Sequence, residues 1–90
     1  MKKNHLTRKQ HQQRSTASRI ERASSPDEIS QIIDASANNF SPDNYRLKIV
    51  YLEGMFGNFE KFYDVLGYSK EKPEHNKIIF QLICYSIIRW

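Results

Sequence analysis

Few residues in this sequence could carry out acid–base or nucleophilic chemistry: the histidines His5, His11 and His75 and one cysteine, Cys84. Cys84 and His75 could in principle act as a nucleophile and its base. The sequence offers no third group to orient the histidine and no oxyanion hole to accompany them. The spacings C-x-x-C and H-x-x-x-H of metal sites are absent, as are glycine-rich phosphate loops. We therefore expect no enzyme activity, no metal and no cofactor, and we interpret Cys84 as a core residue.

Basic side chains are the second chemical feature, and they gather at the N-terminus. Residues 1–24 hold seven lysines and arginines against Glu21, a formal charge of +6, so the rest of the chain carries −2 of the total of +4. Each cation placed near a phosphate releases counterions, which gives salt-sensitive binding independent of base sequence. The candidate nucleic-acid-binding residues are Lys2, Lys3, Arg8, Lys9, Arg14, Arg19 and Arg22.

The same segment has little that it could bury, because all eleven aromatic residues lie at position 40 or later. We interpret residues 1–14 as a basic, flexible and disordered arm and residues 15–90 as one helical domain. A tail that serves only solubility is one alternative. An arginine-rich helix that folds on structured RNA is another, so RNA stays open beside DNA as the expected ligand.

Two copies of the triplet Ser-Pro-Asp, beginning at Ser25 and Ser41, have the composition of helix starts. The first predicts a helix over 26–37, with Glu28 in the position of a capping box. The second predicts a long central helix over 42–66. Its inward positions recur every three or four residues: Tyr45, Ile49, Leu52, Phe56, Phe59, Tyr63 and Leu66. A neighbouring apolar column should be covered as well: Tyr51, Met55, Phe62 and Val65.

Glycines interrupt and end this central helix. Gly54 and Gly57 cost about 1 kcal/mol each relative to alanine, and we interpret them as places where another backbone packs closely, with a local kink as the alternative. Gly67 is predicted to end the helix in a left-handed conformation. Pro73 then has the position of a residue that opens another helix.

The C-terminal run IIFQLICYSIIRW is strongly apolar. It would span only about 20 Å as a helix, against roughly 30 Å for a bilayer core. We interpret it as a buried helix, with a buried strand as the alternative. Tyr85 and Trp90 are candidate anchors for a partner protein, or else they complete the core. The predicted fold is all-α, a small domain of three to four helices with a long central helix behind a basic flexible arm.

One stretch of the chain resembles the Hha/YmoA family, small helical modulators of bacterial gene expression that act with H-NS-type nucleoid proteins. The resemblance covers Arg19 to Asp64. The first matching positions, in the turn and helix after the arm, are Arg19, Ile20, Arg22, Asp27, Ile29, Ile32 and Ile33. Phe40 and Ser41 match the opening of the long helix, and EKFYDVL resembles its closing run.

The resemblance implies a small helical fold and contact with a nucleoid protein through an acidic residue midway along the long helix, which is Glu53 here. A second acidic position of the family falls on Ser30. The family's cysteine near the first turn is replaced by Ala23, and its His-Arg pair after the acidic residue by Gly54 and Met55. The C-terminal segment is also longer and more apolar than the family's short last helix.

Two functional hypotheses follow. In the first, the protein is a cytoplasmic, nucleoid-associated regulator of gene expression that binds DNA phosphates through the arm and an H-NS-type or other regulatory protein through the helical body, around Glu53. In the second, it is a protein–protein interaction module, such as an inhibitor, adaptor or chaperone from a phage, plasmid or secretion locus, with no role in nucleic-acid binding. No membrane association is expected, and a homodimer is left open by both.

Overall fold

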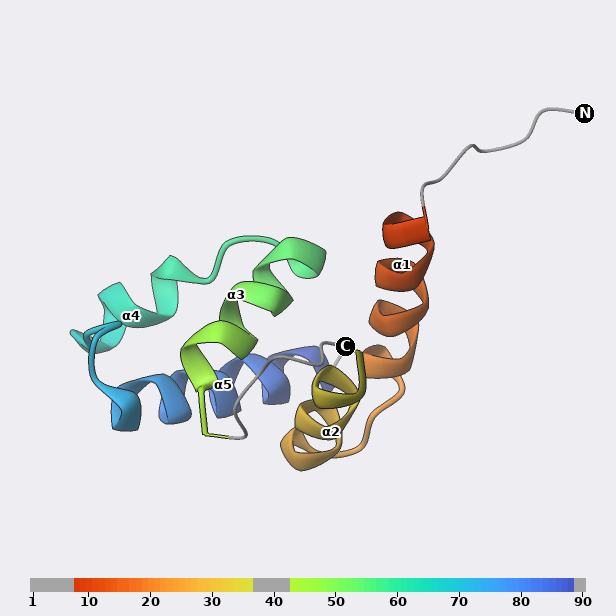
Figure 1. Cartoon of the computed structure of the whole chain (residues 1–90). Helices are drawn as coiled ribbons and strands as arrows, with labels where there is room; N and C mark the ends of the chain where they lie inside the picture. Colours follow the sequence, from red (N-terminus) through yellow and green to blue (C-terminus); the bar gives the residue numbers. More distant parts are fainter. Residues whose placement is uncertain (1–7, 37–42, 89–90) are drawn as a thin grey trace, which may run out of the picture.

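The computed structural model describes residues 8–36 and 43–88, with side chains described for 15–36 and 43–88. These residues form five helices and no strand, which confirms the predicted all-α class. The helices are α1 (Arg8–Glu21), α2 (Pro26–Ser36), α3 (Tyr45–Phe56), α4 (Glu60–Leu66) and α5 (Pro73–Ile88), shown in Figure 1. Within the described ranges, no helix combines the length and apolar character needed to cross a lipid bilayer.

The start of α2 follows the predicted cap. The hydroxyl of Ser25 accepts a hydrogen bond from the amide of Glu28 at 3.2 Å, and the Glu28 carboxylate accepts bonds from the amide and hydroxyl of Ser24. This reciprocal pattern satisfies amides that a helix start otherwise leaves unpaired. Ile29, Ile32 and Ile33 are buried as predicted, because their spacing places them on one face of the helix.

The long central helix predicted over 42–66 is divided in the structure, and that prediction is wrong. α3 ends at Phe56, α4 begins at Glu60, and Gly57 between them has a φ of 113° and an extended ψ of 180°. This region of backbone space is open essentially only to glycine. The described residues therefore form five helices instead of the predicted three or four.

The beginning of α3 also differs from the prediction. Its N-cap is Asn44, whose side chain accepts a hydrogen bond from the amide of Leu47 at 3.2 Å. The second Ser-Pro-Asp triplet therefore ends just before the residue that caps the helix, while Ser41 itself lies outside the described residues.

Close packing of another backbone does not explain the two glycines, so this interpretation is wrong. No atom of another segment lies within 4 Å of the place where a Cβ would stand on Gly54 or Gly57. Gly57 is instead required by the break, which corresponds to the alternative of a kink. Gly67 has a φ of 67° and a ψ of 31°, the predicted left-handed conformation that ends α4.

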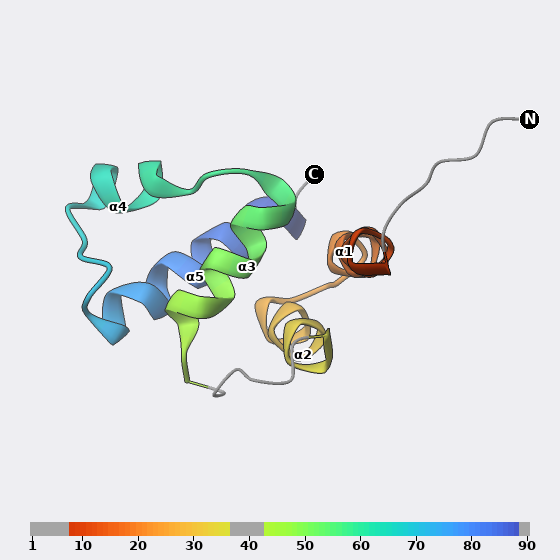
Figure 2. The ribbon, with the colours of Figure 1, turned by 45° about the horizontal axis from the view of Figure 1, so that its top comes forward.

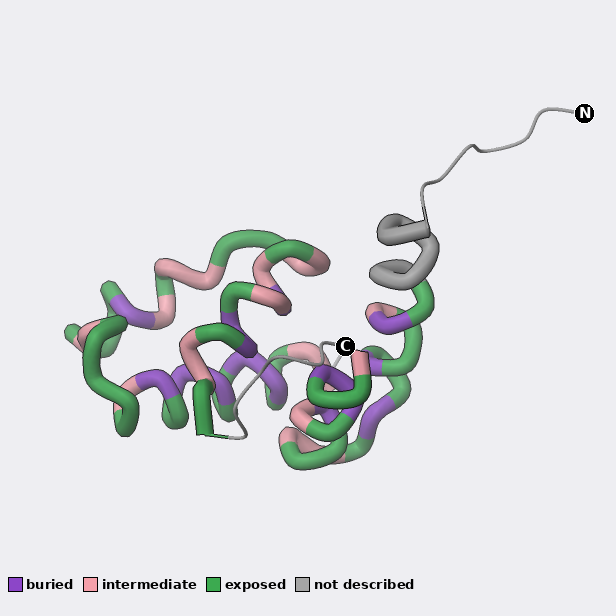
Figure 3. The backbone as a smooth tube through the Cα atoms, viewed as in Figure 1, coloured by how far each residue is buried: buried purple, intermediate pink, exposed green. Residues whose placement is uncertain are grey.

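The apolar C-terminal run forms a helix, as predicted, and this helix already begins at Pro73. α3 crosses α5, and the ring centroids of Tyr45 and Phe80 lie 5.2 Å apart between them. Figure 2 shows α1 and α2 side by side along one flank of this pair, and Figure 3 shows the buried segments turned towards each other. The buried apolar residues are Ile20, Ala23, Ile29, Ile32, Ile33, Ile49, Leu52, Tyr63, Ile79, Phe80, Ile83 and Cys84.

The second apolar column of the predicted central helix is only partly covered. Tyr51, Met55 and Phe62 are half-buried against the core, but Val65 is 80% exposed, and Leu66 of the main seam is 42% exposed. The prediction that both residues are covered is therefore wrong. The break at Gly57 is the reason, because it separates α4 from the axis of α3, so that positions on the two helices no longer share one continuous face.

Candidate nucleic-acid interface

α1 carries most of the predicted nucleic-acid-binding residues. The helix begins at Arg8, so residues 8–14 of the predicted arm belong to its first turns, although their side chains are outside the described part of the structure. Arg8, Lys9, Arg14 and Arg19 all lie on this one helix of 14 residues. Lys2 and Lys3 lie outside the described residues.

The C-terminal end of α1 presents two arginines side by side. Ile20 and Ala23 are buried, and the last turn is closed by hydrogen bonds from Arg22 N to Arg19 O and from Ala23 N to Ile20 O. Because the two apolar side chains anchor this turn in the core, Arg19 and Arg22 are held on its solvent side, where both are exposed.

Arg19 and Arg22 line an open hollow of about 390 Å³ together with residues of α2: Glu28, Gln31 and Ile32. The hydrogen bonds donated by the hydroxyl and amide of Ser24 lower the pKa of Glu28, so its carboxylate is ionised at neutral pH. The hollow thus combines two guanidinium groups with one carboxylate. Guanidinium groups bind phosphate through paired N–H donors, while the carboxylate opposes an anion placed there.

The N-terminal end of α1 is electrostatically unfavourable for an isolated helix. The helix macrodipole places a partial positive charge at this end, where anions are stabilising and cations are not. The first turn of α1 contains Arg8 and Lys9 and no acidic residue. A bound phosphate would compensate both the dipole and the side-chain charges.

The predicted partner-binding residues lie elsewhere. Glu53 is half-buried near the end of α3, and its carboxylate accepts a hydrogen bond from the amide of Phe59 at 2.9 Å, across the break between α3 and α4. Tyr85 is 55% exposed on α5. Neither residue lines the hollow formed by Arg19 and Arg22. Trp90 lies outside the described residues.

The structure separates the one pair of residues that resembles a thiol nucleophile and its base. His75 and Cys84 are both on α5, nine residues and therefore about 13 Å apart along the helix. The Nδ1 atom of His75 accepts a hydrogen bond from Ser69 N at 3.0 Å, and its ring stacks on Tyr68. Burial raises the pKa of Cys84 to about 12, which keeps its thiol protonated at neutral pH. Among the residues that the structure describes, no three His, Cys, Asp or Glu side chains are grouped to hold a metal ion.

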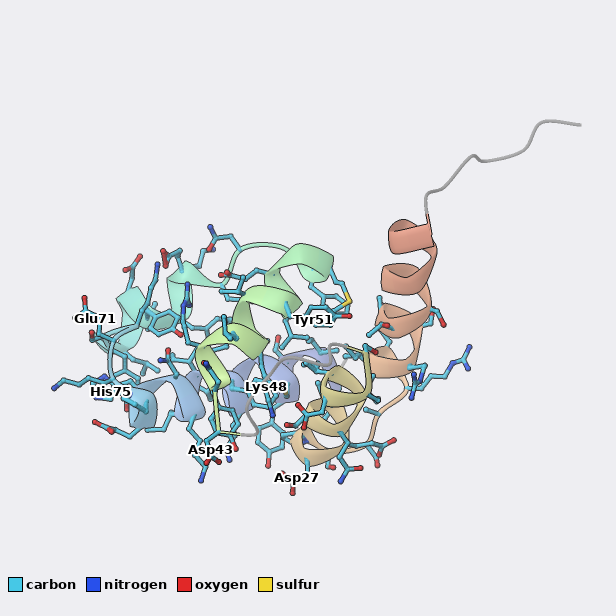
Figure 4. All side chains as sticks on the ribbon, in the orientation of Figure 1. Asp27, Asp43, Lys48, Tyr51, Glu71 and His75 are labelled. Carbon is cyan, nitrogen blue, oxygen red and sulfur yellow. The ribbon has the colours of Figure 1, made fainter. Side chains whose placement is uncertain are left out.

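Sequence reasoning missed a buried cation. Lys48 of α3 is 1% exposed, and its ammonium group donates a hydrogen bond to Ser30 Oγ at 2.6 Å and lies 3.3 Å from a carboxylate oxygen of Asp34. Figure 4 shows Lys48 between α3 and α2. Its position three residues after Tyr45 and four before Leu52 is the signal that could have identified it, because these intervals place it on the inward face.

A second polar cluster joins α3, α4 and α5. The hydroxyl of Tyr63 donates to the side-chain oxygen of buried Asn76 and accepts a bond from Arg46 at 3.2 Å. The Asn76 amide donates to the carbonyl of Lys70 at 2.8 Å. No pattern in the sequence pointed to this cluster, because its members come from three separate segments.

Comparison with protein-family models, curated proteins and solved structures finds no significant match to this chain.

Proposed function

We propose that the protein is a non-enzymatic regulator of gene expression that binds DNA phosphates through α1 and binds a second DNA-organising protein through its helical body. The observation that carries the proposal is the composition of α1, a helix with four basic residues, Glu21 as its one acidic residue, and Arg19 exposed beside Arg22 at its end.

The charge on α1 favours a polyanionic ligand. A helix that is polar on nearly every side gains little from packing, so its first turns depend on other sources of stability. Phosphates close to Arg8 and Lys9 would neutralise repulsion between the cations and complement the dipole of the helix. We therefore expect DNA to increase the stability of α1 when it binds.

The length of α1 suits several phosphates at once. Arg8 and Arg19 are eleven residues apart, or about 16 Å along the helix axis. Each strand of a DNA duplex has one phosphate about every 3.4 Å along the duplex axis, so α1 would span roughly five of them if it lies parallel to that axis. Such contacts position a protein on DNA without reading its bases. Nucleoid localisation in the cytoplasm would follow from this activity.

The resemblance to the Hha/YmoA family supports the second part of the proposal, the H-NS-type or other regulatory partner. Its contact would fall at Glu53. The carboxylate of Glu53 already accepts the amide of Phe59, but a carboxylate has about four lone-pair sites and can accept a further donor from a partner. A basic side chain of a partner protein is the group that fits this position.

A salt series with a labelled DNA duplex tests the proposal. In fluorescence anisotropy, the wild-type protein should lose affinity steeply as salt rises. The variant R8Q/K9Q/R14Q should bind more weakly, with a slope of log K against log salt that is smaller by about 0.9 for each phosphate that is no longer neutralised. R19Q/R22Q tests the hollow in the same way.

The matched control is K61Q/K72Q/K77Q, which removes three exposed cations from α4, α5 and the turn between them. It should bind DNA like the wild type. If the control and R8Q/K9Q/R14Q lose the same DNA affinity, the protein is attracted to DNA by its net charge alone. This result would contradict a role for α1. A structured RNA of equal length, used as competitor, tests the RNA alternative. If the protein binds this RNA more tightly than DNA at every salt concentration, RNA is the ligand instead of DNA.

The second candidate function, an interaction module without nucleic acid, is favoured by the exposure of Tyr85 on α5. Here Tyr85→Ala would abolish capture of a protein partner from the source cell while leaving the helices folded. The DNA titration distinguishes the two functions, because only the regulator binds the duplex. Recovery of DNA-organising proteins that is lost after nuclease treatment would also favour the regulator.

A further inference from the structure

α4 and α5 together present an apolar surface to solvent. Val65 is 80% exposed, Leu66 42%, Ile78 40%, Leu82 38% and Tyr85 55%. We call these five residues the α4/α5 face. A hollow of about 290 Å³ is lined by three of these residues, Val65, Leu66 and Leu82, together with Lys61 and Phe62. An exposed apolar patch of this kind marks an interaction surface in a small domain.

The α5 part of the face does not belong to the core. Ile78, Leu82 and Tyr85 follow each other at intervals of four and three residues, so they form one stripe along the helix. The buried apolar residues of α5 lie on its opposite side: Ile79, Phe80, Ile83 and Cys84. α5 is therefore apolar on two sides. One side packs in the core of the domain, and the other is exposed to solvent.

The charge of the segment that forms the α4/α5 face favours a second copy of the same chain as the binding partner. Residues 60–88 contain four lysines and four acidic residues, so their formal charge is zero, whereas residues 1–24 carry +6. A two-fold contact brings identical surfaces together, which is unfavourable when the surface has net charge and carries no such penalty when the two signs balance. A strongly acidic or basic partner would instead meet two helices and a turn without net charge.

The position of α1 also favours a second copy of the chain as the partner. In both Figures 1 and 2, α4 and the turn into α5 lie at the opposite end of the molecule from α1. The C-terminal half of α5 runs back towards α1, so an antiparallel contact of two α5 helices would place the two α1 helices on opposite sides of the two-fold axis. A domain of this size also has a small core, and pairing is a common source of additional stability for such domains.

We propose that two copies of the chain form a dimer through the α4/α5 face, with their α5 helices antiparallel and Leu82 near the two-fold axis. This arrangement places Ile78 of one copy opposite Tyr85 of the other, and Val65 and Leu66 cover the stripe from the side. The dimer does not depend on DNA binding, but it presents one α1 at each outer end.

Sedimentation equilibrium over the micromolar range tests the dimer. The wild type should have twice the mass of the 10.7 kDa chain. V65K/Y85K should have the mass of one chain, because it places four added ammonium groups in the dimer interface, and its dissociation constant should rise at least about a hundredfold. The matched control L47K/V50K adds the same charge to exposed apolar positions on α3 and should remain a dimer.

Circular dichroism establishes that each variant keeps the helical content of the wild type. A wild-type protein with the mass of one chain at every concentration would overturn the proposal. So would a V65K/Y85K variant that stays dimeric, or dissociation of L47K/V50K.

Cross-linking gives a second measurement that does not weaken the face. Gln81 is exposed beside Leu82, so Q81C should form a disulfide-linked dimer with oxidised glutathione, while native Cys84 is fully buried. The control S24C lies in the connection between α1 and α2, and it should form no disulfide-linked dimer under the same conditions. Cross-linking of S24C without cross-linking of Q81C would place the contact elsewhere and overturn the proposal.

Discussion

Lys48 of α3 and Asp34 of α2 form an ion pair in which one partner is buried and the other is not: the Lys48 side chain is 1% exposed and that of Asp34 40%. Ser30, one turn before Asp34, accepts a hydrogen bond from the same ammonium group. The pair joins two helices that are consecutive in the chain, and its asymmetry determines what each substitution does.

Asp34→Asn should lower the free energy of unfolding by about 1–2 kcal/mol, less than the loss for a fully buried pair because Asp34 is partly solvated. Lys48→Met should lower the free energy of unfolding by less than about 1 kcal/mol. The methionine side chain has a similar length and fills the site, while water solvates the carboxylate of Asp34. Urea denaturation of both variants measures the difference. A larger loss for Lys48→Met than for Asp34→Asn would contradict this account of the pair.

Gly54 and Gly57 should respond to alanine in opposite directions. Gly54 is inside α3 with open space where a Cβ would stand, so Gly54→Ala should raise stability by about 0.5–1 kcal/mol through helix propensity. Gly57 has a φ of 113°, so Gly57→Ala should lower stability by about 1–3 kcal/mol. Thermal unfolding followed by circular dichroism compares the two. If both variants gained stability, the break between α3 and α4 would not require glycine at position 57.

Tyr63→Phe should lower stability at neutral pH by about 1–2 kcal/mol, because it leaves the oxygen of buried Asn76 without its donor. Burial raises the pKa of Tyr63, against the opposing effect of Arg46. The folded pKa therefore lies above the unfolded value of about 10, and the stability due to the neutral phenol is complete below that pH and is lost as pH rises further.

The advantage of the wild type over Tyr63→Phe should consequently shrink above pH 10 or so. Urea denaturation at neutral and alkaline pH measures it. Tyr68→Phe, which removes a half-buried phenol outside this cluster and keeps the ring that stacks on His75, is the control and should leave stability nearly unchanged at neutral pH. An advantage that grows with alkaline pH would have the wrong sign for a buried neutral phenol.

Glu28 links the stability of α2 to the charge of the hollow. The bonds from Ser24 lower its pKa, so the stability that Glu28 contributes is present above the unfolded pKa of about 4.3 and is lost as pH falls through the folded value. Glu28→Gln should therefore show a weaker loss of stability on acidification than the wild type.

The same substitution removes the carboxylate that shares the hollow with Arg19 and Arg22. If these arginines contact phosphates, DNA affinity should rise up to about fivefold at low salt, because the carboxylate no longer repels a phosphate placed in the hollow. Fluorescence anisotropy at low salt measures this change, with Glu74→Gln on α5 as the control that should have no effect. Unchanged affinity in Glu28→Gln would indicate that phosphates do not enter the hollow.

Local signals in the sequence predicted α2, the end of α4 and the helical C-terminal run. Ser25 and Glu28 specify the start of α2, Gly67 the end of α4, and the spacing of Ile29, Ile32 and Ile33 a buried face. Each of these depends on residues within one or two turns of each other, which is the range over which side chains and backbone interact along a helix.

The features that the sequence did not predict depend on contacts between segments. The helical spacing of Phe56, Phe59 and Tyr63 in the sequence continues across the break at Gly57, so this spacing did not reveal that α3 and α4 are separate helices. Lys48 is buried only because Ser30 and Asp34 of another helix receive its ammonium group. At the candidate interface the sequence identified Arg19 and Arg22, but the hollow they share with Glu28 forms only when α2 folds back along α1.

The buried thiol of Cys84 allows unfolding of the native sequence to be measured by chemical modification. It is the one sulfhydryl in the chain, it is 0% exposed, and its pKa of about 12 keeps it unreactive where it lies between α5 and the rest of the core. A thiol reagent can therefore modify the folded protein only during moments when the centre opens. The labelling rate then reports how often the packing of α3 on α5 comes apart, without any introduced label.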